Sequence, residues 1–218
     1  MNATKQMIHD FDKMVNDREK YPGQNWLAVI YRNVGNGTVS APEGMLDVPC
    51  VCWDKDKRGK EYTFRTMLDD EIKRGDIVYI PEQDRYYLLE KLTRRDPQCW
   101  STIATPCNMR ISIYCPMPAE VNDQGYIISP ANKFHYIHAL PCVQRSEPRF
   151  DSVNRNAPGT LALDDLTITL QQNEYTEQIA LGDEFERGLH VYSIVDKQTD
   201  NGIITMHARA KAGETARR

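Results

Sequence analysis

The sequence predicts a mainly β protein: small antiparallel β-barrel or sandwich modules with one N-terminal amphipathic α-helix and a long proline-rich arm. Short β-branched and aromatic runs, separated by Gly, Pro, Asp and Asn clusters, recur over residues 26–114 and 161–210. One helical apolar stripe precedes them, and half of the twelve prolines fall between residues 115 and 160. A hydrophobic content of 40% over 218 residues is sufficient for a core.

The first expected element is a helix within residues 1–23. Thr4 is available as its N-cap, and Tyr-Pro-Gly at 21–23 ends it. The helix either packs on its own domain or docks on a neighbouring subunit. Its apolar residues lie at helical spacing and are Met7, Ile8, Phe11, Met14 and Val15; Met7, Phe11 and Met14 are the candidate partner contacts.

Residues 24–114 are predicted to form a β-barrel-like module. A charged stretch at 54–60 is either a solvated hairpin loop or a projection into a partner or channel, and its candidate contacts are Lys55, Lys57 and Arg58. The expected strands are 26–31, 48–53, 61–67, 76–80, 85–92, 100–104 and 109–114.

Residues 115–160 are predicted to be a proline-rich linker or arm with one inserted strand at 133–140. A second β-module follows at 161–210 and ends in a hairpin, because Asp200-Asn201-Gly202 favours a tight reversal. Residues 211–218 read as a flexible basic tail, and Arg209 and Lys211 are candidate contacts there.

The two predicted modules share an order of parts. Gly75-Asp76 precedes a short strand, a turn, a strand that carries Tyr87 and a final strand. Gly182-Asp183 precedes the same series with Tyr192. The repetition predicts two β-modules of similar plan.

No catalytic motif is found, and we expect no enzyme, cofactor or metal. Walker A, GxGxxG, HExxH, GxSxG and EF-hand patterns are absent from the sequence. His135 and His138 are expected on opposite faces of a strand, and Arg74-Gly75-Asp76 is expected to be a turn. The six cysteines show no zinc spacing and are expected to be reduced and mostly buried.

The charge and hydropathy patterns bear on partners and location. A net charge of −4 does not mark a generic nucleic-acid or anionic-membrane binder. No apolar run reaches the roughly 20 residues of a membrane span, and the first residues lack the core of a signal peptide, so we expect synthesis in a cytosol. A β-barrel that binds single-stranded nucleic acid remains an alternative; its stacking and cationic residues would be Tyr86, Tyr87, Arg85, Arg94 and Arg95.

Two segments carry a resemblance to a known family. They are "IKRGDIVYI…YYLLEKL" and the ending "VYSIVDKQTDNGIITMHAR", within a layout of N-terminal helix, β-module and second β-module. The chain resembles neck proteins of tailed phages that infect Gram-positive hosts, which are head-closure or head-to-tail connector proteins. The resemblance covers most of residues 4–20, 43–114 and 161–210.

The resemblance implies a non-enzymatic virion protein, assembled in the host cytoplasm. Such proteins form homo-oligomeric rings between the portal or an adaptor and a tail protein, and retain double-stranded DNA that passes through the lumen without sequence-specific binding. In such a ring, we expect the terminal hairpin to complete a neighbouring subunit's surface. A tail-side ring protein, such as a tail terminator or distal tail component, is the first alternative, and an enzyme or carbohydrate-binding module is the least favoured.

Overall fold

The computed structural model describes residues 25–32, 45–54, 60–95, 97, 99–147 and 165–215. The predicted N-terminal helix, most of the charged stretch at 54–60 and residues 148–164 lie outside these ranges. Among the described residues, no helix is both long enough and apolar enough to cross a membrane.

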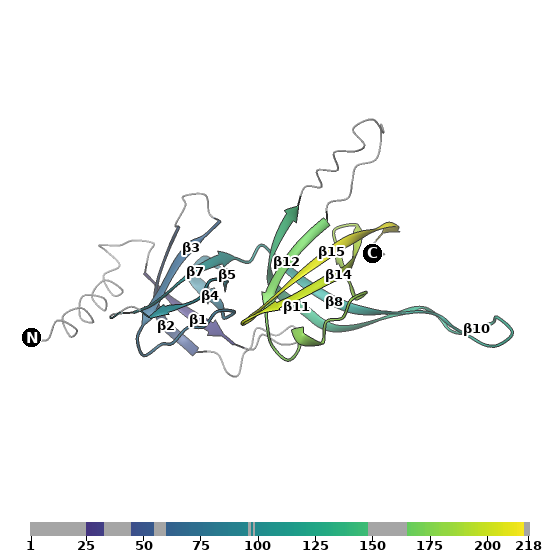
Figure 1. Ribbon diagram of the computed structural model, residues 1–218, viewed down its shortest axis with the longest axis horizontal. Helices are drawn as coiled ribbons and strands as arrows, with labels where there is room; N and C mark the ends of the chain where they lie inside the picture. The colour runs from purple at the N-terminus through teal and green to yellow at the C-terminus, as the bar shows by residue number, and fades with distance from the viewer. Residues whose placement is uncertain are drawn as a thin grey trace, which may run out of the picture.

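The first half of the chain forms a closed antiparallel barrel (Figure 1). Its strands follow the order β3-β2-β1-β4-β5-β7, and β7 pairs back with β3. The short β6 (Arg94–Arg95) continues β5 along β7, and the 3₁₀ turn η1 (Pro81–Gln83) connects β4 to β5. The six barrel strands are β1 (Asn25–Tyr31), β2 (Met45–Asp54), β3 (Tyr62–Met67), β4 (Ile77–Ile80), β5 (Arg85–Leu89) and β7 (Cys99–Pro106).

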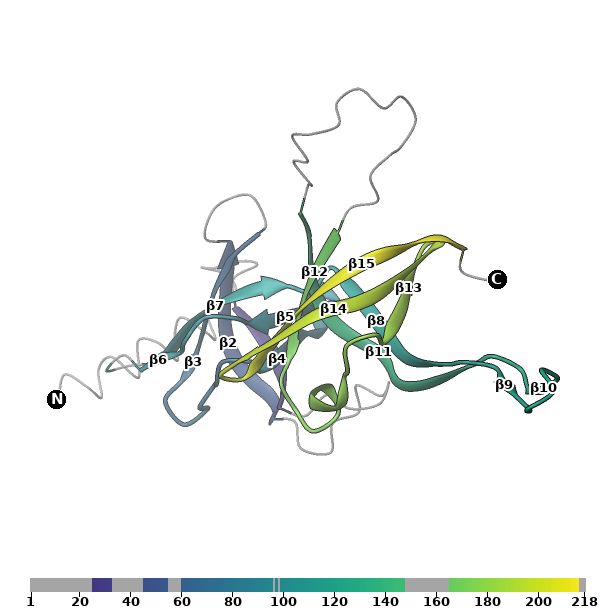
Figure 2. The same ribbon diagram turned by 45° about the vertical axis from the view of Figure 1, so that its right-hand side comes forward.

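The second half forms another closed antiparallel barrel, in the order β11-β12-β15-β14-β13-β8. Its strands are β8 (Met109–Met117), β11 (Asn132–Glu147), β12 (Asp165–Gln171), β13 (Glu184–Arg187), β14 (His190–Asp200) and β15 (Ile203–Thr215). The 3₁₀ turn η2 (Thr176–Gln178) lies between β12 and β13. A two-stranded ribbon, β9 (Glu120–Val121) and β10 (Ile127–Ser129), extends the β8–β11 hairpin beyond the barrel (Figures 1 and 2).

The two barrels have the same topology. If the strands of each are numbered in chain order, both close in the order 1-2-3-6-5-4. β4, β5 and β7 in the first barrel therefore correspond to β13, β14 and β15 in the second, which confirms two β-modules of similar plan.

The repeated Gly-Asp pair has the same geometry in both barrels. The backbone N–H of Gly75 donates to the carbonyl of Leu89 (2.8 Å), and the Leu89 N–H donates to the carbonyl of Asp76 (3.0 Å). Gly182 and Asp183 make the same pair of bonds with Ile194, at 2.9 and 2.8 Å. Two residues thus face one across the ladder, as in a β-bulge that starts with a left-handed glycine, and φ is 93° at Gly75 and 91° at Gly182.

The aspartate of each pair fixes the turn before its strand. Asp76 Oδ2 accepts a hydrogen bond from the N–H of Lys73, and Asp183 Oδ2 accepts one from the N–H of Ala180, both at 2.7 Å. Both aspartates are buried. The Arg-Gly-Asp tripeptide is therefore a turn that starts β4, as predicted.

The barrels pack as one body because strands of the first are buried on both sides. Val78 and Tyr87 face the interior of the first barrel. Their neighbours Ile77 and Leu88 point the other way, into a cluster that also contains the core of the second barrel. The wall formed by β4 and β5 is thus shared by two cores.

The observed boundaries differ from the predicted modules in three places. β8 pairs with β11 and β13, so the barrels meet at Cys107 and Asn108 rather than after residue 114. The inserted strand expected at 133–140 is part of β11, which is sixteen residues long and belongs to the second barrel. The tail expected from residue 211 is still strand β15 as far as Thr215.

Candidate functional site

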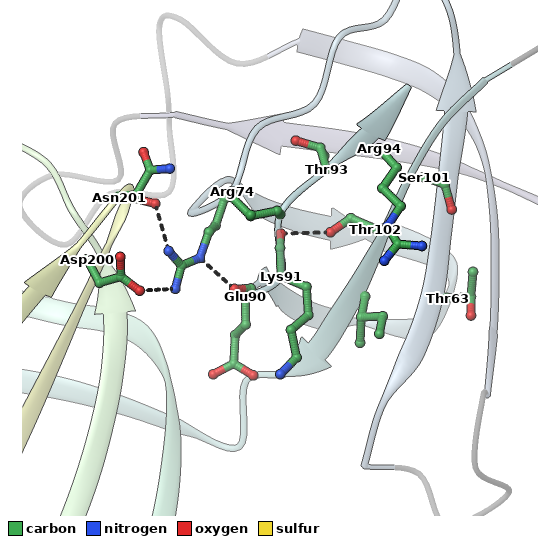
Figure 3. Close-up of a pocket in the computed structure, with 12 residues that line it drawn as sticks. Thr63, Arg74, Glu90, Lys91, Thr93, Arg94, Ser101, Thr102, Asp200 and Asn201 are labelled. Carbon is green, nitrogen blue, oxygen red and sulfur yellow. Dashed lines mark hydrogen bonds and ion pairs between the residues drawn. The ribbon is translucent and has the colours of Figure 1, made fainter. Parts of the chain in front are cut away.

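The tip of the β14–β15 hairpin docks on the Gly-Asp turn of the first barrel (Figure 3). Arg74 makes three bonds there: its Nε donates to the carbonyl of Glu90 (2.7 Å), and its terminal nitrogens reach the Asp200 carboxylate (2.7 Å) and the Asn201 carbonyl (3.4 Å). The tip therefore lies against the first barrel of its own chain, and a contact of the hairpin with a neighbouring subunit stays a prediction.

The charge of Arg74 acts directly on the hairpin tip. The Arg74 guanidinium donates a hydrogen bond to the Asp200 carboxylate, and this bond and its charge hold the pKa of Asp200 below its usual value. Arg74 is mostly buried whereas Asp200 is 73% exposed. Arg74 therefore anchors the hairpin tip through the Asp200 carboxylate, most of which remains exposed to solvent.

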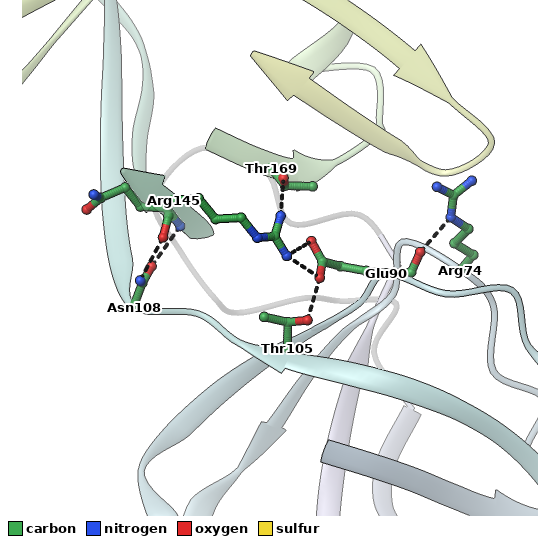
Figure 4. A network of polar contacts seen from close by, with 7 residues as sticks. Arg74, Glu90, Thr105, Asn108, Arg145 and Thr169 are labelled. Atoms are coloured by element: carbon green, nitrogen blue, oxygen red, sulfur yellow. Dashed lines mark hydrogen bonds and ion pairs between the residues drawn. The ribbon is translucent and has the colours of Figure 1, made fainter. Parts of the chain in front are cut away.

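A second ion pair crosses between the barrels (Figure 4). Arg145 of β11 contacts both carboxylate oxygens of Glu90, at 2.7 and 2.9 Å, and also reaches Thr169 Oγ1 at 3.3 Å. The hydroxyl of Thr105 donates to the same carboxylate, and Glu90 is only 10% exposed. This network fixes the orientation of β11 relative to the end of β5.

Gln171 connects the barrels in the buried interior. Its Nε2 donates to the carbonyls of Tyr31 (2.9 Å) and Gly75 (2.8 Å), and the residue is 2% exposed. Both carbonyls belong to the first barrel, so these bonds join the second barrel to buried main chain of the first. Gln171 thus satisfies buried backbone atoms across the junction.

A groove of about 900 Å³ opens beside the docked tip (Figure 3). The exposed side chains on its rim include Lys91, Leu92 and Arg94, while hydroxyls of β3 and β7 line its side. Arg74 and Glu90 are occupied by their own ion pairs. The groove therefore offers cations and hydroxyls that suit binding of an acidic group.

The β8–β11 hairpin and its ribbon form an arm, defined as residues 115–134, that points away from the first barrel (Figures 1 and 2). Its base is held by Lys133, which donates to the Tyr114 hydroxyl (3.1 Å) and to Glu186 of β13 (2.6 Å). At the tip, Asn122 Oδ1 accepts the N–H groups of Gln124 and Tyr126, which closes the turn.

The arm exposes several large apolar side chains. Ile127 and Ile128 are adjacent at a register shift of the β9–β10 ribbon, and they are 67% and 68% exposed. An isolated two-stranded ribbon is at best marginally stable in water, and clustered exposed apolar groups mark interaction sites. The exposed set is Met117, Val121, Tyr126, Ile127, Ile128 and Phe134.

Two of the candidate contacts chosen from sequence, Arg209 and Lys211, lie among the described residues. Arg209 lies 3.7 Å from Asp165, and Lys211 donates to Glu184 at 2.8 Å, so both already pair within the second barrel. A role for them in partner contacts stays a prediction. The other candidates, Met7, Phe11, Met14, Lys55, Lys57 and Arg58, lie outside the described residues.

A linker or arm was predicted here, but its hairpin ribbon and exposed apolar side chains were not, although the sequence contains a signal for the hairpin. "NDQG" at 122–125 is a turn between short runs, and "YIIS" follows it directly. The partners Glu90, Arg145 and Gln171 had no such signal, because contacts between residues more than fifty positions apart leave no local pattern.

The tyrosines of the alternative nucleic-acid site do not form a stacking platform. Tyr87 is fully buried in the first barrel, and burial raises its pKa. Tyr86 stacks on Tyr79 at 4.5 Å between ring centroids. Arg94 pairs with Ser101, whereas Tyr87 pairs with Pro106, so these two residues lie about 16 Å apart along β7; Arg85, by contrast, directly precedes Tyr86 in β5.

The histidine and cysteine predictions have different outcomes. The rings of His135 and His138 stack with centroids 6.0 Å apart, so the expected opposite orientation is wrong; register shifts on either side of Ile137 bring the rings together. Across the described ranges, no group of three or more His, Cys, Asp or Glu side chains is placed to hold a metal ion.

All six cysteines are free, and four of them are buried. Burial raises the thiol pKa of Cys52 and of Cys142 to about 12.

Comparison of the chain with protein-family models, curated proteins and solved structures gives no match.

Proposed function

We propose that this chain is a structural subunit of a tailed-phage neck, assembled as a homo-oligomeric ring that connects the head to the tail. In this role it retains packaged DNA and lets it pass through the lumen. The single observation that carries the proposal is the apolar arm: a rigid body holds it at its base by Lys133, and its tip residues Tyr126, Ile127 and Ile128 are at least 67% exposed.

The body and the arm suit different tasks in such an assembly. Two barrels with a shared core and two inter-barrel ion pairs give a fixed geometry between the ends of the molecule. A ribbon with exposed apolar side chains gains contact area and main-chain hydrogen bonds when it lies on a neighbouring sheet. Heterologous contacts of this kind close into rings when the rotation between copies closes.

The arm's role in assembly is tested by shortening it. Met117 pairs with Asn132, so residues 118–131 can be replaced by Asn-Gly to close a two-residue hairpin. The truncated protein should keep its thermal unfolding midpoint and lose ring formation in native mass spectrometry with the portal oligomer. A control that replaces Asp123 and Gln124 by Ser, at the polar tip, should assemble normally.

The neck position is tested on particles. Gold-labelled antibody against this chain should mark the junction between head and tail in electron micrographs of the phage that encodes it. Label at the far end of the tail would support the tail-side alternative. Absence of the chain from tailed particles would overturn the proposal.

A further inference from the structure

The groove beside the docked hairpin tip runs over the outer face of the first barrel. Phe64 and Ala104 belong to the core of that barrel, so their strand neighbours Thr63 and Ile103 point outward. Thr63 and Ile103 lie directly opposite each other in the β3–β7 ladder, and both line the groove. Ser101, two residues before Ile103 in β7, has the same orientation. The floor of the groove is therefore made of paired strands and has a fixed shape.

The segment between β5 and β6 forms another part of the groove wall (Figure 3). Its main chain is held by side chains of the first barrel. Thr102 Oγ1 donates to the carbonyl of Lys91 at 3.0 Å, and Arg74 Nε donates to the carbonyl of Glu90 at 2.7 Å. The side chain of Leu92 is 64% exposed, and Lys91 is exposed as well. Both side chains therefore line the groove from an anchored main chain.

Two cations of the groove have no counter-charge. The other charged residues in its lining, Arg74, Glu90 and Asp200, all belong to ion pairs. Among the residues that the structure describes, Lys91 and Arg94 form no ion pair. Two positive charges are thus left over in a concave site, where the field of a charge is concentrated. Such a site attracts an anionic group.

Hydroxyl groups lie beside one of these cations. Arg94 and Ser101 are directly opposite in the β6–β7 ladder, so their side chains share one face. Within the described part of the chain, the hydroxyls of Ser101 and Thr63 make no hydrogen bond, and both can donate to a ligand. A cation next to a hydroxyl donor suits an oxyanion, because hydrogen bonds to a charged acceptor are the stronger ones.

Apolar side chains and an acidic edge favour a peptide over a nucleic acid. Leu92 and Ile103 line the groove beside the cations, and the Asp200 carboxylate at its edge is 73% exposed. That carboxylate repels a run of phosphates, whereas a peptide can bring single carboxylates to the cations and an apolar side chain to Leu92. The volume of about 900 Å³ is within the range of about 300–1,000 Å³ that is usual for ligand sites.

We propose that the groove binds an acidic peptide segment of a partner protein, with carboxylates on Lys91 and Arg94 and an apolar side chain against Leu92. The hydroxyls of Thr63 and Ser101 donate to the carbonyls of the bound segment. The inference goes beyond ring assembly and does not depend on it. The groove lies against the first barrel, whereas the arm points away from that barrel (Figure 2).

The probe is the acetylated and amidated peptide Glu-Glu-Leu-Glu-Glu-Leu, titrated against the isolated chain by calorimetry at low salt. Lys91→Gln and Arg94→Gln should each weaken binding about threefold, and the double variant about tenfold. Arg187→Gln is the matched control, because it removes the same charge from an exposed position on β13 and should bind like the wild type. All three side chains are exposed, so the thermal unfolding midpoint should not change.

Nuclear magnetic resonance locates the peptide. The backbone amide signals of Thr63, Ser101 and Ile103 should shift during the titration. The inference is overturned if the peptide does not bind saturably, if the shifts are confined to other residues, or if Arg187→Gln loses as much affinity as Arg94→Gln. Wild-type affinity for a peptide with glycine in place of both leucines would overturn the apolar contact and with it the proposed ligand.

A thymidine oligonucleotide distinguishes peptide from phosphate. If it binds more tightly than the peptide, and the same two substitutions weaken it, the groove is a phosphate site and the assignment to an acidic peptide is wrong. Weaker binding of the oligonucleotide supports the peptide. Ring formation does not enter this test, so loss of the proposed neck assembly and loss of peptide binding are observed separately.

Discussion

Gly75 and Gly202 meet backbone to backbone at the junction of the two barrels. A Cβ atom on Gly202 would lie 2.2 Å from the carbonyl oxygen of Arg74, and one on Gly75 would lie 1.9 Å from the carbonyl oxygen of Gly202. Both residues also have positive φ, at 93° and 90°. Glycine is therefore required here twice, by conformation and by the close approach of two main chains.

Replacing Gly75 by Ala should destabilise the protein by more than conformational strain alone. The left-handed φ costs about 1–2 kcal/mol for a residue with a side chain. The backbone clash adds to this cost, because neither chain can move without breaking the Arg74 and Gln171 contacts. We expect a loss of about 3 kcal/mol or more in the free energy of unfolding, measured by urea denaturation.

Gly182→Ala is the matched control for this substitution. Its φ is nearly the same and its would-be Cβ meets nothing, so it should lose only the conformational part. Equal losses for the two variants would show that the close approach of the main chains contributes no stability.

Gln171→Ala should cost about 2–4 kcal/mol. The substitution removes two buried hydrogen bonds, to the carbonyls of Tyr31 and Gly75, and losing each of them costs about 1–2 kcal/mol. Gln198→Ala is the comparison, since its Nε2 donates to the Asp196 carboxylate at an exposed site. Chemical denaturation of both variants checks the prediction, which fails if the two losses are alike.

The sequence predicted most strands but not which barrel each one completes. The pattern "MRISIY" is a good strand in either module, because periodicity shows which face is buried and not which strands are neighbours. Its pairing with β11 and β13 is settled by contacts up to about seventy residues away. The repeated Gly-Asp pair could be recognised because a left-handed glycine and a capping aspartate leave a local signature.

The prolines led to the prediction of a linker or extended arm with one inserted strand, not of paired strands on both sides of the arm. Pro116 and Pro118 interrupt the expected pattern of a central strand. Here the ribbon has only one partner strand, so its outer edge needs no N–H donor and tolerates proline. The candidate contacts were placed on apolar residues of the N-terminal helix and on basic residues such as Arg209, while the apolar side chains of the arm received no role.

The ion pair between Glu90 and Arg145 should show an asymmetric response to truncation. Arg145→Ala leaves a carboxylate that is only 10% exposed without its counter-charge, whereas Glu90→Ala leaves a half-exposed guanidinium that water can solvate. We expect losses of about 2–3 kcal/mol and about 1 kcal/mol, respectively. The double variant should lose less free energy of unfolding than the sum of the two single losses. If the single losses instead add up to the loss of the double variant at low salt, the two residues do not interact directly.

Asp76 should make the protein more stable as the pH falls from 7 to 4. Burial raises the pKa of this carboxyl from 3.8 to about 6, against the opposing effects of the Lys73 N–H and of Arg32. The folded state therefore binds the proton before the unfolded state does, and protonation favours folding over this range. One pKa unit corresponds to about 1.4 kcal/mol, so the difference between 3.8 and about 6 adds up to about 3 kcal/mol to the free energy of unfolding.

The Asp76→Asn variant isolates this contribution. Its amide oxygen can still accept the Lys73 N–H, but it carries no charge that burial could destabilise. Free energies of unfolding measured at half-unit pH steps should rise toward pH 4 more steeply for the wild type than for the variant, because other groups titrate in both. Parallel curves between pH 7 and 4 would show that Asp76 ionises equally well in the folded and unfolded states, and the burial of its carboxylate would then cost nothing.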